Sequence, residues 1–220
     1  MKKFAIATAV ATLFASSAAV SAPFVWGNVY TDLLINENAS QKESQIIGIE
    51  GGVDTGSTDV YGFFEHNPNL ENEFGKVTIH SKLVGDFGAY GRASMFKEGG
   101  FSEDRYILGV GYQGFVGDGY AFKPYVGGLR IDINEYAEED QLAFGYAGYK
   151  TLAPGVVLSS WVDARIDESK VKAGGSVGIQ KDMDFLKPGT YVGAFYNMNY
   201  HEAGIKGYSD SVQLRVGMHF

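Results

Sequence analysis

The last ten residues of the sequence, 211–220, alternate strictly between apolar and polar or small positions. The two rows are Val212, Leu214, Val216, Met218 and Phe220 against Ser211, Gln213, Arg215, Gly217 and His219. Because successive side chains of a β-strand point to opposite faces, this pattern predicts a strand with one hydrophobic face and one polar face. An edge strand of a soluble β-protein would show the same pattern, so the rest of the chain has to decide between the two.

The same alternation recurs along the chain from about residue 25 and predicts twelve strands. The clearest internal case is 76–83, where three apolar positions oppose four polar ones: Val77, Ile79 and Leu83 against Lys76, Thr78, His80 and Lys82. Segments 58–66 and 190–201 are aromatic on both rows, so the pattern does not assign their facing. For 125–131 we expect one row outward and the other inward: Tyr125, Gly127, Leu129 and Ile131 outward, Val126, Gly128 and Arg130 inward.

Six polar connections alternate with five tighter ones along the predicted strands. The six polar connections hold 16 of the 26 acidic residues but only five basic residues, Lys42, Lys97, Lys170, Lys172 and Lys206. The spacing suits strands of about 9–11 residues, the length that crosses a bilayer at a tilt. This arrangement is typical of long outer loops and short periplasmic turns.

The hydrophobic content, 45%, and the absence of any run of 18 apolar residues after the N-terminus exclude a transmembrane helix. A transmembrane β-barrel needs no such run, because half of its strand residues face the lumen.

The N-terminal 22 residues have the pattern of a secretory signal peptide. Lys2 and Lys3 precede a short apolar stretch, and small residues run from Ala15 to Ala22. We expect residues 1–22 to be cleaved and residues 23–220 to form one barrel domain, with cleavage after Ala19 as an alternative. Loss of the two lysines moves the formal net charge from -8 to -10.

The charge and the motifs exclude several classes of function. A net negative chain does not suit nucleic acid, whose phosphates require a basic surface. There is no cysteine, so disulfides and thiolate metal sites are excluded. The four histidines never fall at metal-ligand spacing, and no Gly-x-Ser-x-Gly motif is present. We therefore expect no enzyme, no cofactor and no metal.

An amphipathic strand that ends on an aromatic residue, here Phe220, resembles the terminal strand of bacterial outer-membrane β-barrels, where it acts as the assembly signal. The predicted fold is all-β: a transmembrane antiparallel β-barrel of about twelve strands. The expected partners are outer-membrane lipid, lipopolysaccharide and the outer-membrane assembly machinery. A soluble lipocalin-like barrel is the alternative fold.

The predicted inner rows collect the basic residues of the strands: Lys76, Lys82, Arg92, Arg105, Arg130, Arg165 and Arg215. A charge on the lipid face costs about 2–4 kcal/mol at mid-bilayer, so these residues should face the lumen or the rims. Other candidates for the pore lining are aromatic or polar: Tyr30, His80, Tyr90, Trp161, Asp163 and Gln213. A flat ring can stack on a nucleobase or a sugar. Interior packing and mutual charge pairing explain the same residues equally well.

Three short motifs carry a family resemblance. They are Trp26-Gly27-Asn28, the run Tyr61-Gly62-Phe63-Phe64-Glu65 after Asp59, and Gly75-Lys76 after an acidic loop. In these the chain resembles the Tsx-type nucleoside-channel and OmpK-like outer-membrane protein family. The resemblance implies a monomeric barrel, a narrow, passive channel for nucleosides and outer loops that serve as a phage receptor. A non-conducting structural or receptor barrel with a plugged lumen, serving phage, colicin or adhesion, is the alternative function.

Overall fold

The computed structural model describes residues 24–36, 44–134, 136–137, 141–167, 170–198 and 210–220. The predicted signal peptide, 1–22, lies outside the described residues. The chain forms β-strands joined by turns, and these are β1 Phe24–Asn36, β2 Ser44–Asp54, β3 Thr58–Asn67, β4 Asn72–Val84, β5 Phe87–Glu98, β6 Phe101–Tyr112, β7 Phe115–Gly117, β8 Tyr120–Ile133, β9 Tyr136–Ala137, β10 Gln141–Ala153, β11 Val156–Asp167, β12 Lys170–Asp182, β13 Thr190–Met198 and β14 Ser211–His219.

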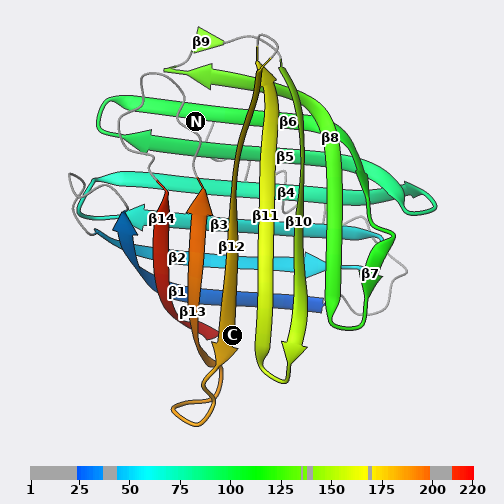
Figure 1. The fold of residues 1–220 in the computed structure, drawn as a ribbon. Helices are drawn as coiled ribbons and strands as arrows, with labels where there is room; N and C mark the ends of the chain where they lie inside the picture. The colour runs from blue at the N-terminus through cyan, green and yellow to red at the C-terminus, as the bar shows by residue number, and fades with distance from the viewer. Residues whose placement is uncertain (1–23, 37–43, 135, 138–140, 168–169, 199–209) are drawn as a thin grey trace.

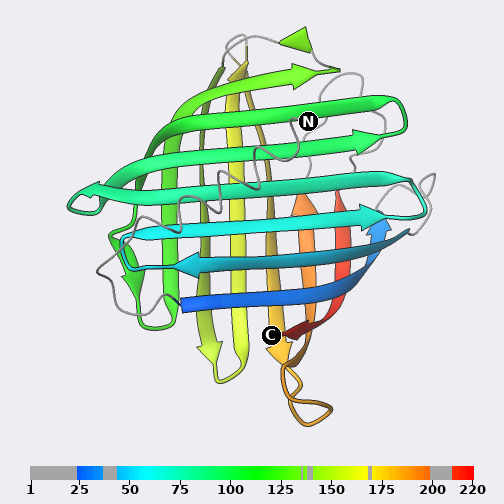
Figure 2. The same cartoon turned by 180° about the vertical axis from the view of Figure 1, so that it is seen from behind.

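Twelve of these strands close into one antiparallel barrel, as the sequence predicted. The ring runs β1–β6, β8 and β10–β14, each strand paired with its neighbours; β14 pairs with β1, and β8 pairs with β10. Among the described residues, the short strands β7 and β9 pair with β8 and with no other strand. Figures 1 and 2 show β1–β6 along one wall and β8 to β14 along the other, with the strands of the two walls crossing steeply. Such crossing follows from the strand tilt that closure of a barrel requires.

The contact between the first and last strands sets the seam of the barrel. Asp32 of β1 lies opposite Arg215 of β14, and the flanking positions pair in step. The backbone N–H of Phe220 donates to the carbonyl oxygen of Gly27 at 2.9 Å. The terminal amphipathic strand is therefore a full member of the wall, not an edge.

The outer wall is apolar and exposed, as the alternation predicted. Leu108 and Val110 of β6 point outward with 77% and 52% of their surface exposed, while Ile107, which precedes Leu108 on the same strand, is fully buried. An apolar outer surface of this extent suits hydrocarbon, in which each backbone polar group must be paired, and a closed ring meets that demand. No helix among the described residues is long and apolar enough to cross a membrane.

The facing expected for 125–131 was wrong. Tyr125, Leu129 and Ile131 of β8 are buried inside the barrel, whereas Val126 and Arg130 are exposed on the outside. The inward residues of β8 join a small apolar cluster within the lumen: Tyr90, Ile107, Tyr125, Leu129, Ile131 and Ala143. Apolarity alone did not decide the facing, because this barrel has oily patches on both surfaces.

Arg130 is thus corrected from the lumen to the outer wall. Arg130 lies three residues before the end of β8, and 56% of its side chain is exposed. Its Nε donates to Asp132 at 3.2 Å. A long cationic side chain near a strand end can extend toward water, which lowers the cost of its outward position.

The two strands without an assigned facing are resolved by their partners. On β3, Tyr61 and Glu65 point into the lumen, where they contact Glu50 and Tyr30. On β13, Tyr191 is fully buried, whereas Met198 is exposed. Both strands therefore place part of their aromatic surface inside the barrel.

Candidate functional site

The lumen contains a buried charge cluster built around Arg215 at the seam. The guanidinium makes two hydrogen bonds to Asp32, Nε to Oδ1 and Nη2 to Oδ2, each 2.8 Å long. Glu50 and Glu65 approach the same guanidinium at 3.6 Å each. The side chain of Asp32 is fully buried and 9% of that of Arg215 is exposed. Three carboxylates from β1, β2 and β3 thus hold one cation of β14.

Two tyrosines complete this cluster. The Arg215 guanidinium carbon lies 3.5 Å from the ring centroid of Tyr30, whose hydroxyl donates to Glu65 at 2.8 Å. The ring lies across Gly48, where a Cβ would come within 2.3 Å of it, so a larger residue there would displace the ring. The Tyr61 hydroxyl donates to a Glu50 oxygen at 3.0 Å.

A second ion pair crosses the lumen between β5 and β11. Arg92 Nη1 lies 2.5 Å from Asp163 Oδ1 and 3.3 Å from the hydroxyl of Tyr125 on β8. Tyr125 also donates its hydroxyl to Asp163, and its ring stacks on Tyr90 at 4.1 Å between centroids. The pair joins strands that are not neighbours in the ring, so it spans interior space and does not merely run along one wall.

Lys76 of β4 is surrounded by aromatic rings between these two clusters. Its Nζ lies 4.9 Å from the ring centroid of Trp161, 5.1 Å from that of Phe63 and 6.0 Å from that of Tyr61. Trp161 belongs to β11 on the opposite wall, whereas the other two rings belong to β3. Within the described part of the chain Lys76 makes no direct ion pair with a carboxylate, and the nearest contacts of its charged group are the faces of these rings.

A third contact spans the lumen near the tight turns. Lys123 Nζ of β8 lies 2.5 Å from Asp59 Oδ2 of β3, and about a fifth of each side chain is exposed. Both residues lie close to their strand starts, next to the turns at 55–57 and 118–119. The end of the barrel with short turns is thus bridged by a pair that water can reach.

Most of the candidates predicted from the sequence do lie on the inner face. The structure brings Tyr30 to the Arg215 cluster, and it brings Tyr90, Arg92, Asp163, Lys76 and Trp161 together in the middle of the barrel. His80 is buried edge-on to Tyr90, Arg165 is buried, Gln213 shares the inner row of β14, Lys82 pairs locally with Asp86, and Arg105 pairs with Glu103.

Several residues of the site were missed in the sequence. Asp32 and Glu50 stand on the polar rows of their strands, so alternation alone could have found them. Tyr125 was assigned to the wrong face, and Glu65 lies in a strand whose facing the pattern did not assign. The basic residues predicted for the lumen are therefore largely matched by carboxylates, as expected if interior charges pair with each other.

Comparisons with known proteins give similarity at the level of the fold. No protein-family model matches the sequence, and no curated protein matches it. Among solved structures, a KdgM porin in complex with disordered oligogalacturonate is similar over 89% of this chain and 98% of its own, with 8% identity and a TM-score of 0.50. A loop-deletion mutant of OmpT, an outer-membrane protein of Vibrio cholerae, covers 91% of this chain and 100% of its own, at 10% identity and a TM-score of 0.44.

The outer-membrane channel DcaP of Acinetobacter baumannii is similar over 93% of this chain and 100% of its own, with 10% identity and a TM-score of 0.41. At these identities the likeness concerns the fold. The closed twelve-strand ring, its exposed apolar outer wall and its similarity to a porin confirm the predicted fold class and the bacterial outer-membrane localisation.

Proposed function

We propose that this protein is a selective outer-membrane channel that passes small solutes bearing a flat ring, with nucleosides as the principal candidates, by passive diffusion. The observation that carries this proposal is the position of Lys76. Its ammonium group lies among three aromatic rings from two opposite walls of the lumen. A solute with a flat ring could stack on one of these aromatic rings in place of the Lys76 ammonium, or lie against the ammonium in place of one of the rings.

The energies of the contacts favour passage at this point and not at the seam. A cation–π contact is worth about 0.5–2 kcal/mol, and stacking of a base on an aromatic ring is worth about 1–3 kcal/mol. Exchange of one for the other is therefore nearly balanced, which suits a site that must bind a solute and release it. Breaking the buried Arg215–Asp32 pair would cost about 3–5 kcal/mol. The Arg215 cluster is therefore a rigid part of the barrel wall that does not open for a solute.

Polar groups for a sugar lie on both sides of Lys76. Asp163 and the Glu50 and Glu65 carboxylates are acceptors that ribose hydroxyls could use, while Trp161 and Tyr61 offer faces for a base. The Tsx-like motifs support the same solute class, because two of them contribute Tyr61, Glu65 and Lys76 to this region.

Transport measurements test the proposal. Purified protein in liposomes should admit radiolabelled adenosine faster than a disaccharide or hexose derivative of similar size. Equal rates for the two solutes would remove the selectivity, and no flux of either would remove the channel. Empty liposomes and liposomes that contain heat-denatured protein are the controls.

A second candidate function is a non-conducting receptor barrel, whose outer loops bind a partner such as a phage or lipopolysaccharide. The Lys123–Asp59 and Arg92–Asp163 pairs favour it, since both cross the lumen and join non-neighbouring strands. Single-channel recording separates the two candidates. Discrete conductance steps that adenosine blocks support the channel, and a silent bilayer supports the receptor.

A further inference from the structure

The outer wall carries a groove where β8, β10 and β11 approach the tight turns. It is an open depression of about 420 Å³, and it is lined by Tyr120, Ala121, Phe122, Gly148, Tyr149, Lys150, Leu158 and Ser160. Gly148 forms the floor: a Cβ there would lie 2.6 Å from the Ala121 carbonyl oxygen, so no larger side chain fills the space. The volume falls within the range of small-molecule sites, about 300–1,000 Å³.

Strand register explains which side chains surround this groove. Lys150 of β10 lies opposite Tyr120 of β8 and Leu158 of β11, in one row across three strands. The next row is Phe122, Gly148 and Ser160. Tyr120, Phe122 and Leu158 are exposed on the outer wall at 46%, 40% and 37%. Both rows therefore face the surroundings of the barrel, not the lumen.

The groove combines an apolar wall with one cation. Lys150 is exposed, stands on the outer face, and makes no ion pair among the residues the structure describes. A lysine on this face carries a cost in hydrocarbon unless its ammonium reaches a polar partner at the interface. The Ser160 hydroxyl, one row away, supplies a second polar group on the same face.

A series of exposed and half-buried aromatic rings leads into the groove. Phe87 lies 4.9 Å from Tyr112, Tyr112 lies 4.9 Å from Phe115, Phe115 lies 6.0 Å from Phe122, and Phe122 lies 4.8 Å from Tyr146, measured between ring centroids. Aromatic residues of membrane barrels gather at the level of the lipid headgroups. The ring contacts thus place the groove at a headgroup boundary, where a phosphate and an acyl chain meet.

We propose that this groove binds one anionic phospholipid, with an acyl chain between Tyr120, Phe122 and Leu158 and the headgroup phosphate on Lys150. The turn side of such a barrel faces the periplasmic leaflet, which is built of phospholipids. An anionic lipid supplies the negatively charged partner that Lys150 does not have among the described residues. Each lysine or arginine near the membrane surface contributes a favourable contact with anionic lipid.

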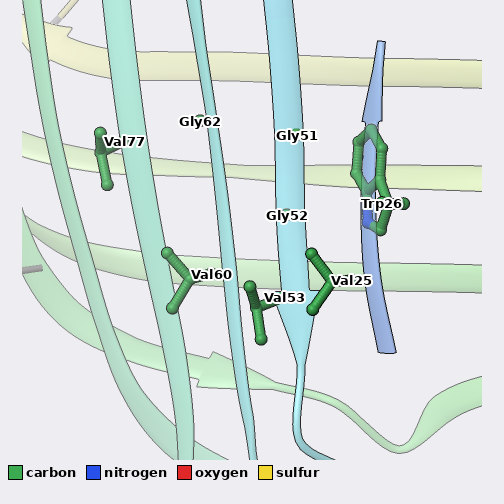
Figure 3. A pocket seen from close by; sticks show the side chains of 8 residues that line it. All are labelled: Val25, Trp26, Gly51, Gly52, Val53, Val60, Gly62 and Val77. Carbon is green, nitrogen blue, oxygen red and sulfur yellow. The ribbon is translucent and has the colours of Figure 1, made fainter. Parts of the chain in front are cut away.

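A second groove on the outer wall offers an internal comparison. It lies over β1–β4, and Figure 3 shows four valines around the bare backbone of Gly51 and Gly62. Its lining is Val25, Trp26, Gly51, Gly52, Val53, Val60, Gly62 and Val77, without a charged residue. This groove can hold a hydrocarbon chain but offers no cation for a phosphate, so we expect it to bind lipid without headgroup preference.

Native mass spectrometry of the detergent-purified protein tests the proposal. Wild type should retain one dioctanoyl phosphatidylglycerol molecule but not dioctanoylglycerol, which has the same chains without the phosphate. Lys150→Gln should lower the retained fraction about five-fold, and Lys150→Arg should preserve it. Ser160→Leu, which fills the groove and leaves the charge unchanged, should also lower it.

Lys181→Gln is the matched control. Lys181 is an exposed lysine of β12 that lies opposite Val156, at the end of the barrel with the tight turns, and it does not line the groove. Unchanged lipid retention in Lys150→Gln would overturn the proposal. An equal loss of retention in Lys181→Gln would overturn it as well, because the total positive charge at this end of the barrel would then explain the binding. A dimer that Ser160→Leu dissociates would assign the groove to a second copy of the chain and would overturn it too.

Discussion

Lys123 and Asp59 form an ion pair 2.5 Å long, although the strands that carry them, β8 and β3, are separated in the barrel by β4, β5 and β6. The contact crosses the lumen near the short turns. Because water reaches both side chains, the pair contributes only about 0.2–1 kcal/mol. Its position matters more than its energy, since it stands in the path of any solute that would leave through this end.

The Lys123→Gln variant is expected to conduct more than wild type and to lose no more than about 1 kcal/mol of stability. Removing the ammonium releases Asp59 and widens the turn side of the lumen. Single-channel recording in planar bilayers measures the conductance, and urea titration into lipid vesicles measures the free energy of unfolding.

Lys82→Gln is the control for this prediction. Lys82 pairs with Asp86 at 3.2 Å within a single turn and does not cross the lumen. Its loss should leave the conductance at the wild-type value. If Lys82→Gln and Lys123→Gln changed the current equally, general lumen charge would explain the effect and the bridge would not.

Trp161→Ala should weaken the binding of adenosine in the lumen by about 5- to 150-fold, the equivalent of one lost stacking contact of ~1–3 kcal/mol. The indole is the ring nearest to Lys76 and the one supplied by the opposite wall. Adenosine block of the ionic current gives the affinity. Trp161→Phe keeps a flat ring and should retain most of the block; an alanine variant that adenosine blocks as well as wild type would contradict stacking at this residue.

Arg215→Met should destabilise the folded barrel by about 3–5 kcal/mol, because it leaves Asp32, Glu50 and Glu65 without their shared cation inside the lumen. Urea unfolding in lipid vesicles measures the loss. Arg130→Gln, which removes an exposed outer-wall pair with Asp132, should cost no more than about 1 kcal/mol. Comparable losses in the two variants would contradict a structural role for the seam cluster.

The fold could be predicted from the sequence because its signal is local. Alternation along each strand reports which face is apolar, and the eleven connections, six polar and five tighter, report where the chain reverses. The rule failed at β8, where Leu129 and Ile131 pack inside against Ile107. There both faces of the strand offer apolar residues, and only the neighbouring strands decide which face is buried.

The candidate site depended on distances that no local pattern reports. Asp32 and Arg215 are separated by 183 positions and meet only because the ring closes. Lys76 and Trp161 meet because the lumen is narrow between β4 and β11. Alternation placed Arg215, Lys76 and Trp161 on the inner face, but which inward residue meets which is set by register and barrel diameter.

The outer wall gives a prediction about the membrane itself. Leu108 is 77% exposed and stands between the exposed Tyr106 and Val110 on β6. Leu108→Arg should lower the free energy of unfolding, measured in lipid vesicles, by about 2–4 kcal/mol, the cost of an arginine on the lipid face near the bilayer midplane. Leu108→Phe keeps the position apolar and should fold as wild type does. A well-tolerated arginine would mean that this face meets water or another polypeptide, and it would remove the physical basis for regarding the exposed leucines and valines as a lipid-facing band.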